Sequence, residues 1–285
     1  MKKPGFYILL FTSLLTAWTV LLGTLSYKYV TNLTEPTCPA SVEQRPGYQP
    51  YTLQTKDGYQ LRGWYHPAQN GAAIILLAGN GGSRDAMLPD AEMLARHGYG
   101  SLTLEYRNCA GGRSTLGYRE AEDIQELVKF AGKQPGVKWL GVIGFSAGGV
   151  AAIRGAAQTK EIQAVVSEGN YYSLDYEIRN SKAAPFTLEW QIQNLVVLWY
   201  RLLIGVWPAE VNPAADLVLL SPRPVMLVYG EGELANNRGV AQYDELKPPR
   251  QLWVVPAVNH GGYSQKWPDE YEKLIINFFD KARNP

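Results

Sequence analysis

Gly144-Phe145-Ser146-Ala147-Gly148-Gly149 is the stretch from which the fold of this chain can be predicted. It follows an apolar run, residues 139–143, that is typical of a buried strand, and it precedes a run of small residues, 150–157, that is typical of a helix. In a G-x-S-x-G elbow the serine occupies a sharp turn between a strand and a helix, and only residues without bulk let the two backbones approach. The flanking elements therefore favour a nucleophile at Ser146 over an ordinary glycine-serine loop.

Outward from this elbow, apolar runs alternate with helical patterns. Strands are expected at residues 51–55, 59–65, 72–78, 101–106, 164–168, 224–229 and 251–255, and helices at 85–96, 118–131 and 269–281. This alternation predicts a mostly parallel sheet with helices on both faces. Residues 171–218 break the rhythm with aromatic-rich helical patterns. We expect them to form a lid insertion over the carboxyl ends of the strands, where ligands bind.

The N-terminal segment has the pattern of a membrane anchor. Residues 4–27 carry no charge, and a helix of this length can cross a hydrocarbon core of about 30 Å. The residues that follow offer only a poor cleavage site, so an uncleaved transmembrane signal anchor over residues 1–30 is favoured over a cleaved signal peptide. Lys2 and Lys3 precede the run and Lys28 follows it, which favours a single-pass protein with its soluble domain on the non-cytoplasmic side.

The rest of the chain has the composition of one globular domain. We expect a proline-rich linker at 31–48 and a domain at 49–285 that contains the lid, because 46% hydrophobic content can bury a full core. The 27 basic and 26 acidic residues favour a small-molecule partner and no nucleic acid. Cys38 and Cys109 could pair in an oxidising compartment, but two unpaired buried thiols are the simpler interpretation. Neither has a partner at metal-ligand spacing, so no metal is expected, and the sequence leaves the oligomeric state open.

A serine hydroxyl needs a base to remove its proton and a third group to orient that base. His66 ends an early strand, and His97 ends a helix, where a cation simply complements the dipole. His260 lies in a glycine-rich loop after the last strand, from which it can reach an elbow serine, and it is the candidate base. Glu231 and Glu233 both follow the strand before it, so either could be the acid.

These motifs, in this order, resemble the α/β-hydrolase superfamily, and more closely the membrane-anchored or secreted serine hydrolases whose first buried strand ends in a His-Gly-Asn-Gly-Gly-like loop. The resemblance covers residues 50–283 and implies an α/β-hydrolase fold. It selects Glu233 as the acid, because relatives usually carry the acid three residues after a glycine, here Gly230. It also implies an oxyanion hole formed by the N–H groups of Ala147 and Asn80.

The chain departs from the family pattern in three places. Ala78 stands where relatives often carry histidine, the acid is glutamate and not aspartate, and residues 107–114 only loosely resemble the Arg-Gly-x-Gly-x-Ser loop of the family. These departures leave the subfamily and the substrate open, but they remove none of the catalytic groups.

The resemblance implies acyl transfer in two steps, with Ser146 as nucleophile, His260 as base and Glu233 as the acid that orients it. We expect a serine hydrolase without a cofactor that cleaves a carboxylic ester, or a related acyl bond, of a small or lipid-like substrate. One alternative is a catalytically silent, membrane-tethered binding or scaffold protein of the same fold. Another is a serine peptidase, against which the lack of an N-terminal propeller-sized domain argues.

For the aromatic residues of the lid, packing against the sheet is a simpler interpretation than contact with substrate. Trp190, Trp199 and Trp207 are the main candidates for such packing. Residues 195–198 are apolar and could also contact the membrane that anchors the chain. The sequence alone does not separate a buried helix from an interfacial one here.

Overall fold

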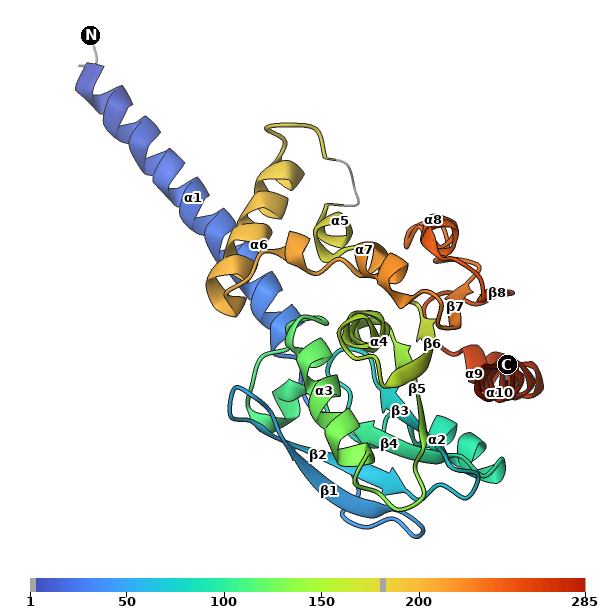
Figure 1. The fold of residues 1–285 in the computed structure, drawn as a ribbon. Coiled ribbons are helices and arrows are strands. Elements are labelled where there is room, and N and C mark those ends of the chain that lie inside the picture. The colour runs from blue at the N-terminus through green and yellow to red at the C-terminus, as the bar shows by residue number, and fades with distance from the viewer. Residues whose placement is uncertain (1–3, 180–182, 285) are drawn as a thin grey trace.

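The computed structural model describes residues 4–179 and 183–284, which form a sheet flanked by helices (Figure 1). The sheet has eight strands in the order β1-β2-β4-β3-β5-β6-β7-β8. Their bounds are β1 Gln49–Gln54, β2 Gln60–His66, β3 Ala72–Leu77, β4 Gly100–Leu104, β5 Trp139–Phe145, β6 Ile162–Glu168, β7 Val225–Gly230 and β8 Arg250–Val255. β2 is antiparallel to β1 and β4, and the remaining neighbours are parallel.

Burial along the strands explains this arrangement. All six residues of β3 and of β7 are buried, as expected of parallel strands that are covered on both faces. β1 alternates between buried and exposed positions, because it is an edge strand with one face toward solvent. The predicted mostly parallel sheet is therefore confirmed, with an antiparallel hairpin at one edge.

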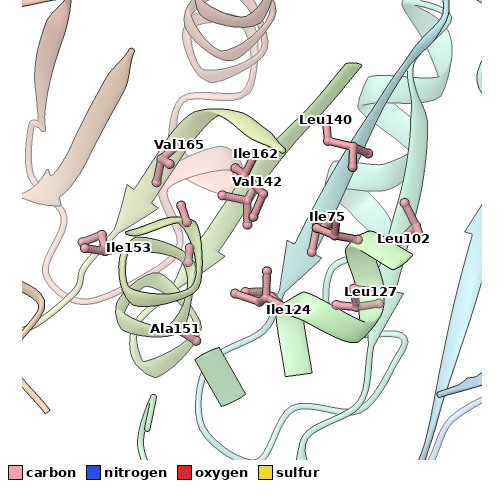
Figure 2. Packing of buried hydrophobic residues seen from close by; sticks show 14 of the residues in the cluster. Ile75, Leu102, Ile124, Leu127, Leu140, Val142, Ala151, Ile153, Ile162 and Val165 are labelled. Atoms are coloured by element: carbon pink, nitrogen blue, oxygen red, sulfur yellow. The ribbon is translucent and has the colours of Figure 1, made fainter. Parts of the chain in front are cut away.

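Helices cover both faces of the sheet. They are α2 Leu88–Arg96, η1 Arg107–Ala110, α3 Arg119–Ala131, α4 Ala147–Gln158, α8 Gly239–Glu245, α9 Tyr263–Lys266 and α10 Pro268–Arg283. Figure 2 shows the apolar layer between α3, α4 and the sheet, where Ile124 and Leu127 of α3 face Ile75 and Leu102 of the strands. A second apolar cluster joins α2 and α10 to the opposite face.

The predicted lid insertion lies between β6 and β7. It contains α5 Leu174–Ile178, α6 Leu188–Ile204, η2 Pro208–Glu210, α7 Pro213–Leu217 and η3 Val218–Leu220. The buried residues of α6 that pack on the domain are Val196, Tyr200 and Ile204, and Trp199 packs partly buried against the same cluster. Trp199 also contacts the N-terminal helix, and Trp207 is exposed, so neither packs against the sheet as we expected.

The N-terminal helix α1, Pro4–Thr34, is long and apolar enough to span a membrane. It continues beyond the segment expected to be the anchor because its last turns dock on the domain. The buried side chains of these turns, which recur at every fourth position, are Leu22, Ser26, Val30 and Thr34. The backbone N–H of Ser114 donates to the carbonyl of Thr34 at 2.7 Å and fixes the end of the helix.

The segment after α1 is held by a disulfide between Cys38 and Cys109, whose Cα atoms are 5.0 Å apart. This corrects the simpler sequence interpretation of two unpaired thiols. The docked end of α1 explains the pairing, because it brings the following residues over η1, where the amide of Asn108 donates to the carbonyl of Pro36 at 2.8 Å. A separation of 71 residues hides this proximity from the sequence.

We expect replacement of both cysteines, Cys38→Ala with Cys109→Ala, to lower the free energy of unfolding by about 4 kcal/mol, because the bridge restricts a long loop of the unfolded chain. Guanidinium unfolding of the full chain in detergent measures this difference. Reduction of the unsubstituted protein should give the same loss. Equal midpoints for the oxidised protein and the double variant would contradict the assignment.

Candidate active site

The elbow between β5 and α4 holds Ser146 in a strained backbone conformation, with φ 54° and ψ −121°. Positive φ is unusual for a residue with a side chain and persists only where the surroundings impose it. Here two glycines allow the close approach. A Cβ on Gly144 would lie 2.1 Å from the carbonyl oxygen of Gly148, and one on Gly148 would lie 2.3 Å from that of Ala78. The glycines of the predicted elbow are therefore sterically required.

The structure brings Ser146, His260 and Glu233 together. The Nε2 atom of His260 lies 3.1 Å from the Oγ of Ser146, and its Nδ1 lies 2.6 Å from an Oε of Glu233. The three residues come from the turns that follow β5, β7 and β8, at the carboxyl ends of parallel strands. The imidazole is half-exposed, whereas the carboxylate is buried, so the serine side of this chain of hydrogen bonds faces the solvent.

Three further donors satisfy the buried carboxylate of Glu233. The backbone N–H of Gly230 donates at 2.9 Å, the amide of Asn237 donates at 3.0 Å, and the hydroxyl of Tyr263 also donates. These bonds offset the cost of burying a charge and fix the orientation of the carboxylate. Sequence reasoning missed Asn237 and Tyr263, because neither belongs to a recognisable motif.

Each of the residues that competed for a role in the site has another place in the structure. Glu231 accepts a hydrogen bond from the backbone N–H of Ala257 at 3.0 Å and is exposed. His97 pairs with Glu272 at 2.8 Å on the surface. The ring of His66 packs against that of Tyr48.

Asn80 and Ala147 are the residues expected to form the oxyanion hole. Ala147 is the first residue of the twelve-residue helix α4, where free N–H groups and the helix dipole favour an anion. Within residues 4–179 and 183–284, no hydrogen-bond acceptor is found for the backbone N–H of either residue. The side chain of Asn80 points away and donates to the carbonyl of Leu33 at 2.8 Å, so only its backbone is free to serve the site. The preceding Gly79 is also close, since a Cβ there would lie 3.4 Å from that of Ser146.

A second group of acidic side chains lies behind the elbow. The backbone N–H of Ser146 donates to the carbonyl of Glu168 at 2.7 Å. The hydroxyl of Tyr271 lies 2.8 Å from the carboxyl of Glu168 and 2.7 Å from that of Asp90. The hydroxyl of Tyr271 has one proton and can donate it to only one carboxylate. One of the two carboxyl groups must therefore carry a proton of its own. Burial, and then the charge of Asp90, raise the pKa of Glu168 to about 8.

These acids do not form a metal site. Among the residues that the structure describes, no cluster of three or more His, Cys, Asp or Glu side chains is arranged to hold a metal ion.

We expect Gly144→Ala to lower the free energy of unfolding by about 3 kcal/mol or more, because its methyl group would overlap the backbone of α4. Gly132→Ala is the matched control. A Cβ at Gly132 would have 3.4 Å to its nearest neighbour, so that variant should change stability by less than about 1 kcal/mol. Denaturant unfolding compares the two, and similar values for both would contradict the steric argument.

We expect Glu168→Gln to alter how stability depends on pH. Below pH 4.5 the carboxyl is protonated in both states, and between 4.5 and about 8 mainly the unfolded chain ionises, so this group lowers stability as the pH rises. The variant should therefore melt about 10 °C higher than the unsubstituted protein at pH 8, with little difference at pH 4.5. The exposed control Glu161→Gln should show no such trend. A constant difference across this pH range would refute the assignment.

Comparison with known proteins gives relatives of one fold. No known protein-family model matches the chain. The polyketide transferase grgF of Penicillium sp is 32% identical over 122 residues, which span 40% of this chain and only 42% of the transferase. The esterase Pf2001 of Pyrococcus furiosus is 27% identical, with a TM-score of 0.69 over 86% of this chain and 97% of the esterase.

A more distant structure is Est1E of Butyrivibrio proteoclasticus, which is 18% identical with a TM-score of 0.62 over 84% of this chain and all of Est1E (100%). The α/β hydrolase GrgF of Penicillium sp. sh18 is also 18% identical, with a TM-score of 0.64 over 82% of this chain and 98% of GrgF. The chain is therefore an α/β-hydrolase-fold protein whose solved structural neighbours include esterases.

Proposed function

We propose that the chain is a serine hydrolase that cleaves a carboxylic ester, or a related acyl bond, through an acyl-enzyme. The observation that carries this proposal is the continuous chain of hydrogen bonds from Ser146 through His260 to Glu233, with distances of 3.1 and 2.6 Å. These hydrogen bonds start at a serine held in the strained elbow. They have the arrangement that a weak nucleophile needs for activation.

The proposed reaction has two steps. The Oγ of Ser146 attacks the acyl carbon while Nε2 of His260 takes its proton, and the same proton then protonates the leaving alcohol. Glu233 accepts a hydrogen bond from Nδ1–H and stabilises the imidazolium that forms. The backbone N–H groups of Asn80 and Ala147 stabilise the oxyanion in each tetrahedral intermediate. Water, activated by His260, then hydrolyses the acyl-enzyme.

Likeness to the Pyrococcus furiosus esterase supports an ester as the substrate. A catalytically silent scaffold is a weaker candidate, because it would have no use for an aligned nucleophile, base and acid, nor for the donors that orient Glu233. A serine peptidase would use the same groups. The two enzyme classes differ in the acyl bond that they cleave, and substrates that differ in that bond separate them.

We also propose that α1 anchors the protein in a membrane as a single span, with the catalytic domain on the non-cytoplasmic side. Its length and composition support the span. The disulfide between Cys38 and Cys109 supports the orientation, because such bonds persist in oxidising compartments. The proposed partners are thus a small-molecule ester or acyl substrate and the membrane, with no nucleic acid.

We expect Ser146→Ala to abolish covalent labelling by a fluorophosphonate and to abolish hydrolysis of para-nitrophenyl esters, while the protein stays folded. Ser41→Ala, in the segment after α1, is the matched control and should label normally. A parallel series of aminoacyl amides separates esterase from peptidase activity. If Ser146→Ala still labels or still cleaves the ester at the original rate, the assignment is wrong.

A further inference from the structure

The anchor helix α1 and the lid helix α6 pair side by side and run in the same direction (Figure 1). The indole N–H of Trp18 donates to the side chain of Gln191 at 3.2 Å. Two turns later along α6, the indole N–H of Trp199 donates to the carbonyl of Gly23 at 3.0 Å, and its ring meets that of Tyr27 edge-on. These contacts fix the position of α6 along the axis of α1, so that Gln191 lies beside Trp18.

The length of α1 then decides how α6 lies relative to a bilayer. The first buried side chain of α1 is Leu22. Residues 5–21, which precede it, form a segment only about 25 Å long at 1.5 Å per residue, shorter than a hydrocarbon core of about 30 Å. Lys3 blocks an extension toward the N-terminus, so a complete span must continue to about Thr24. Trp18, and with it the start of α6, then lies about 9 Å inside the hydrocarbon boundary.

The side chains of α6 are mixed at this depth. Its N-terminal half carries Glu189, Gln191 and Asn194 among apolar residues, and Arg201 is the other charged side chain of its 17 residues. One face packs on the domain through Val196, Tyr200 and Ile204. A different face leaves three leucines uncovered, with exposed fractions of 48% for Leu188, 44% for Leu198 and 62% for Leu202. Phe186, two positions before the helix, is 83% exposed. The domain covers one face of α6 and α1 pairs with another, so the exposed leucines match an apolar surrounding on the face that remains.

We propose that the N-terminal half of α6 is embedded in the outer leaflet of the bilayer beside α1, and that substrate reaches Ser146 from the membrane between α5 and α6. The occupant of the uncovered face of α6 is thus lipid. The substrate is an ester with a long acyl chain. The substrate part of this inference rests on the proposed serine hydrolase, whereas the position of α6 does not.

A hollow of about 500 Å³ between α5 and α6 provides the route. Leu188, at the membrane end of α6, forms one part of its lining, and Glu177 of α5 forms another. α5 begins shortly after Gly169, where a Cβ would lie 3.1 Å from the ring of His260, so the α5 side of the hollow lies toward the triad.

The anchor also sets the height of the site. Leu33, whose carbonyl holds the side chain of Asn80, lies nine residues beyond Thr24, or about 14 Å along the helix. A substrate carbonyl must therefore rise well above the hydrocarbon to reach the proposed oxyanion hole. Moving one acyl chain out of the hydrocarbon costs less free energy than moving two. The geometry therefore favours a single-chain amphiphile over a diacyl lipid as substrate.

The position of α6 can be tested with the full chain in phosphatidylcholine vesicles. Leu188→Cys is labelled with bimane under oxidising conditions, in which the native cysteines remain in their disulfide. Val240→Cys is the matched control, because Val240 is also apolar and half-exposed but lies on α8, away from α1 (Figure 1). We expect doxyl-labelled lipid to quench the probe at position 188 at least about twofold more than the control, and iodide to quench the control more. Equal quenching of both by iodide would overturn the embedding.

The route of the substrate is tested with two esters. Phe186→Asp with Leu188→Asp places charges at the embedded end of α6, whereas Val240→Asp is the control. The activity of the double variant on para-nitrophenyl palmitate carried in vesicles should be about tenfold lower than that of the unsubstituted protein. Its activity on soluble para-nitrophenyl acetate should be unchanged. Unchanged palmitate activity, or an equal loss on both esters, overturns the route. Failure of the unsubstituted protein to cleave either ester would instead overturn the proposed hydrolase, and the quenching result would still locate α6.

Discussion

The structure depends on the close approach of β5 and α4 at Ser146. The backbone of this serine is held at positive φ because Gly144 and Gly148 let the helix pass directly over the strand ends. The same approach starts α4 at the residue after the serine and brings the loop around Gly79 close to its side chain. The proposed nucleophile and the proposed oxyanion donors thus owe their positions to one steric constraint, and the strain is offset by the packing of the sheet.

Around this elbow, buried polar groups are arranged in two layers. In the first, Glu233 receives hydrogen bonds from the backbone of Gly230, from Asn237 and Tyr263, and from the imidazole. In the second, Glu168 lies behind the strand end and shares a tyrosine hydroxyl with Asp90. Because the first layer is satisfied by fixed donors, its carboxylate stays oriented, whereas the raised pKa of Glu168 reduces the negative charge behind the serine near neutral pH.

Local patterns were enough to predict the sheet and the elbow, because each depends on residues that are close in sequence or on the order of strands. They left Glu231 and Glu233 equally placed, and only the resemblance to the family selected Glu233. Contacts between distant segments were not predictable in this way. The disulfide depends on how the end of α1 docks, and Trp199 packs on the anchor and not on the sheet. Asn237 likewise reaches the acid only through the turn that precedes α8. Apolar patterns show that a helix is buried on some face, but they do not name what covers it.

Helix α1 is therefore packed into the rest of the fold and is not a tether beside it, since Trp199 of α6 and the side chain of Asn80 both donate to its carbonyl groups. Acylation of Ser146 during turnover is the step on which the proposed function depends. The most direct test is mass spectrometry of the full chain, quenched with acid during hydrolysis of a para-nitrophenyl ester and then digested. We expect the mass of the acyl group on the peptide that contains Ser146. Turnover with the acyl group on another residue, or with none on this peptide when the ester is in excess, would contradict this expectation.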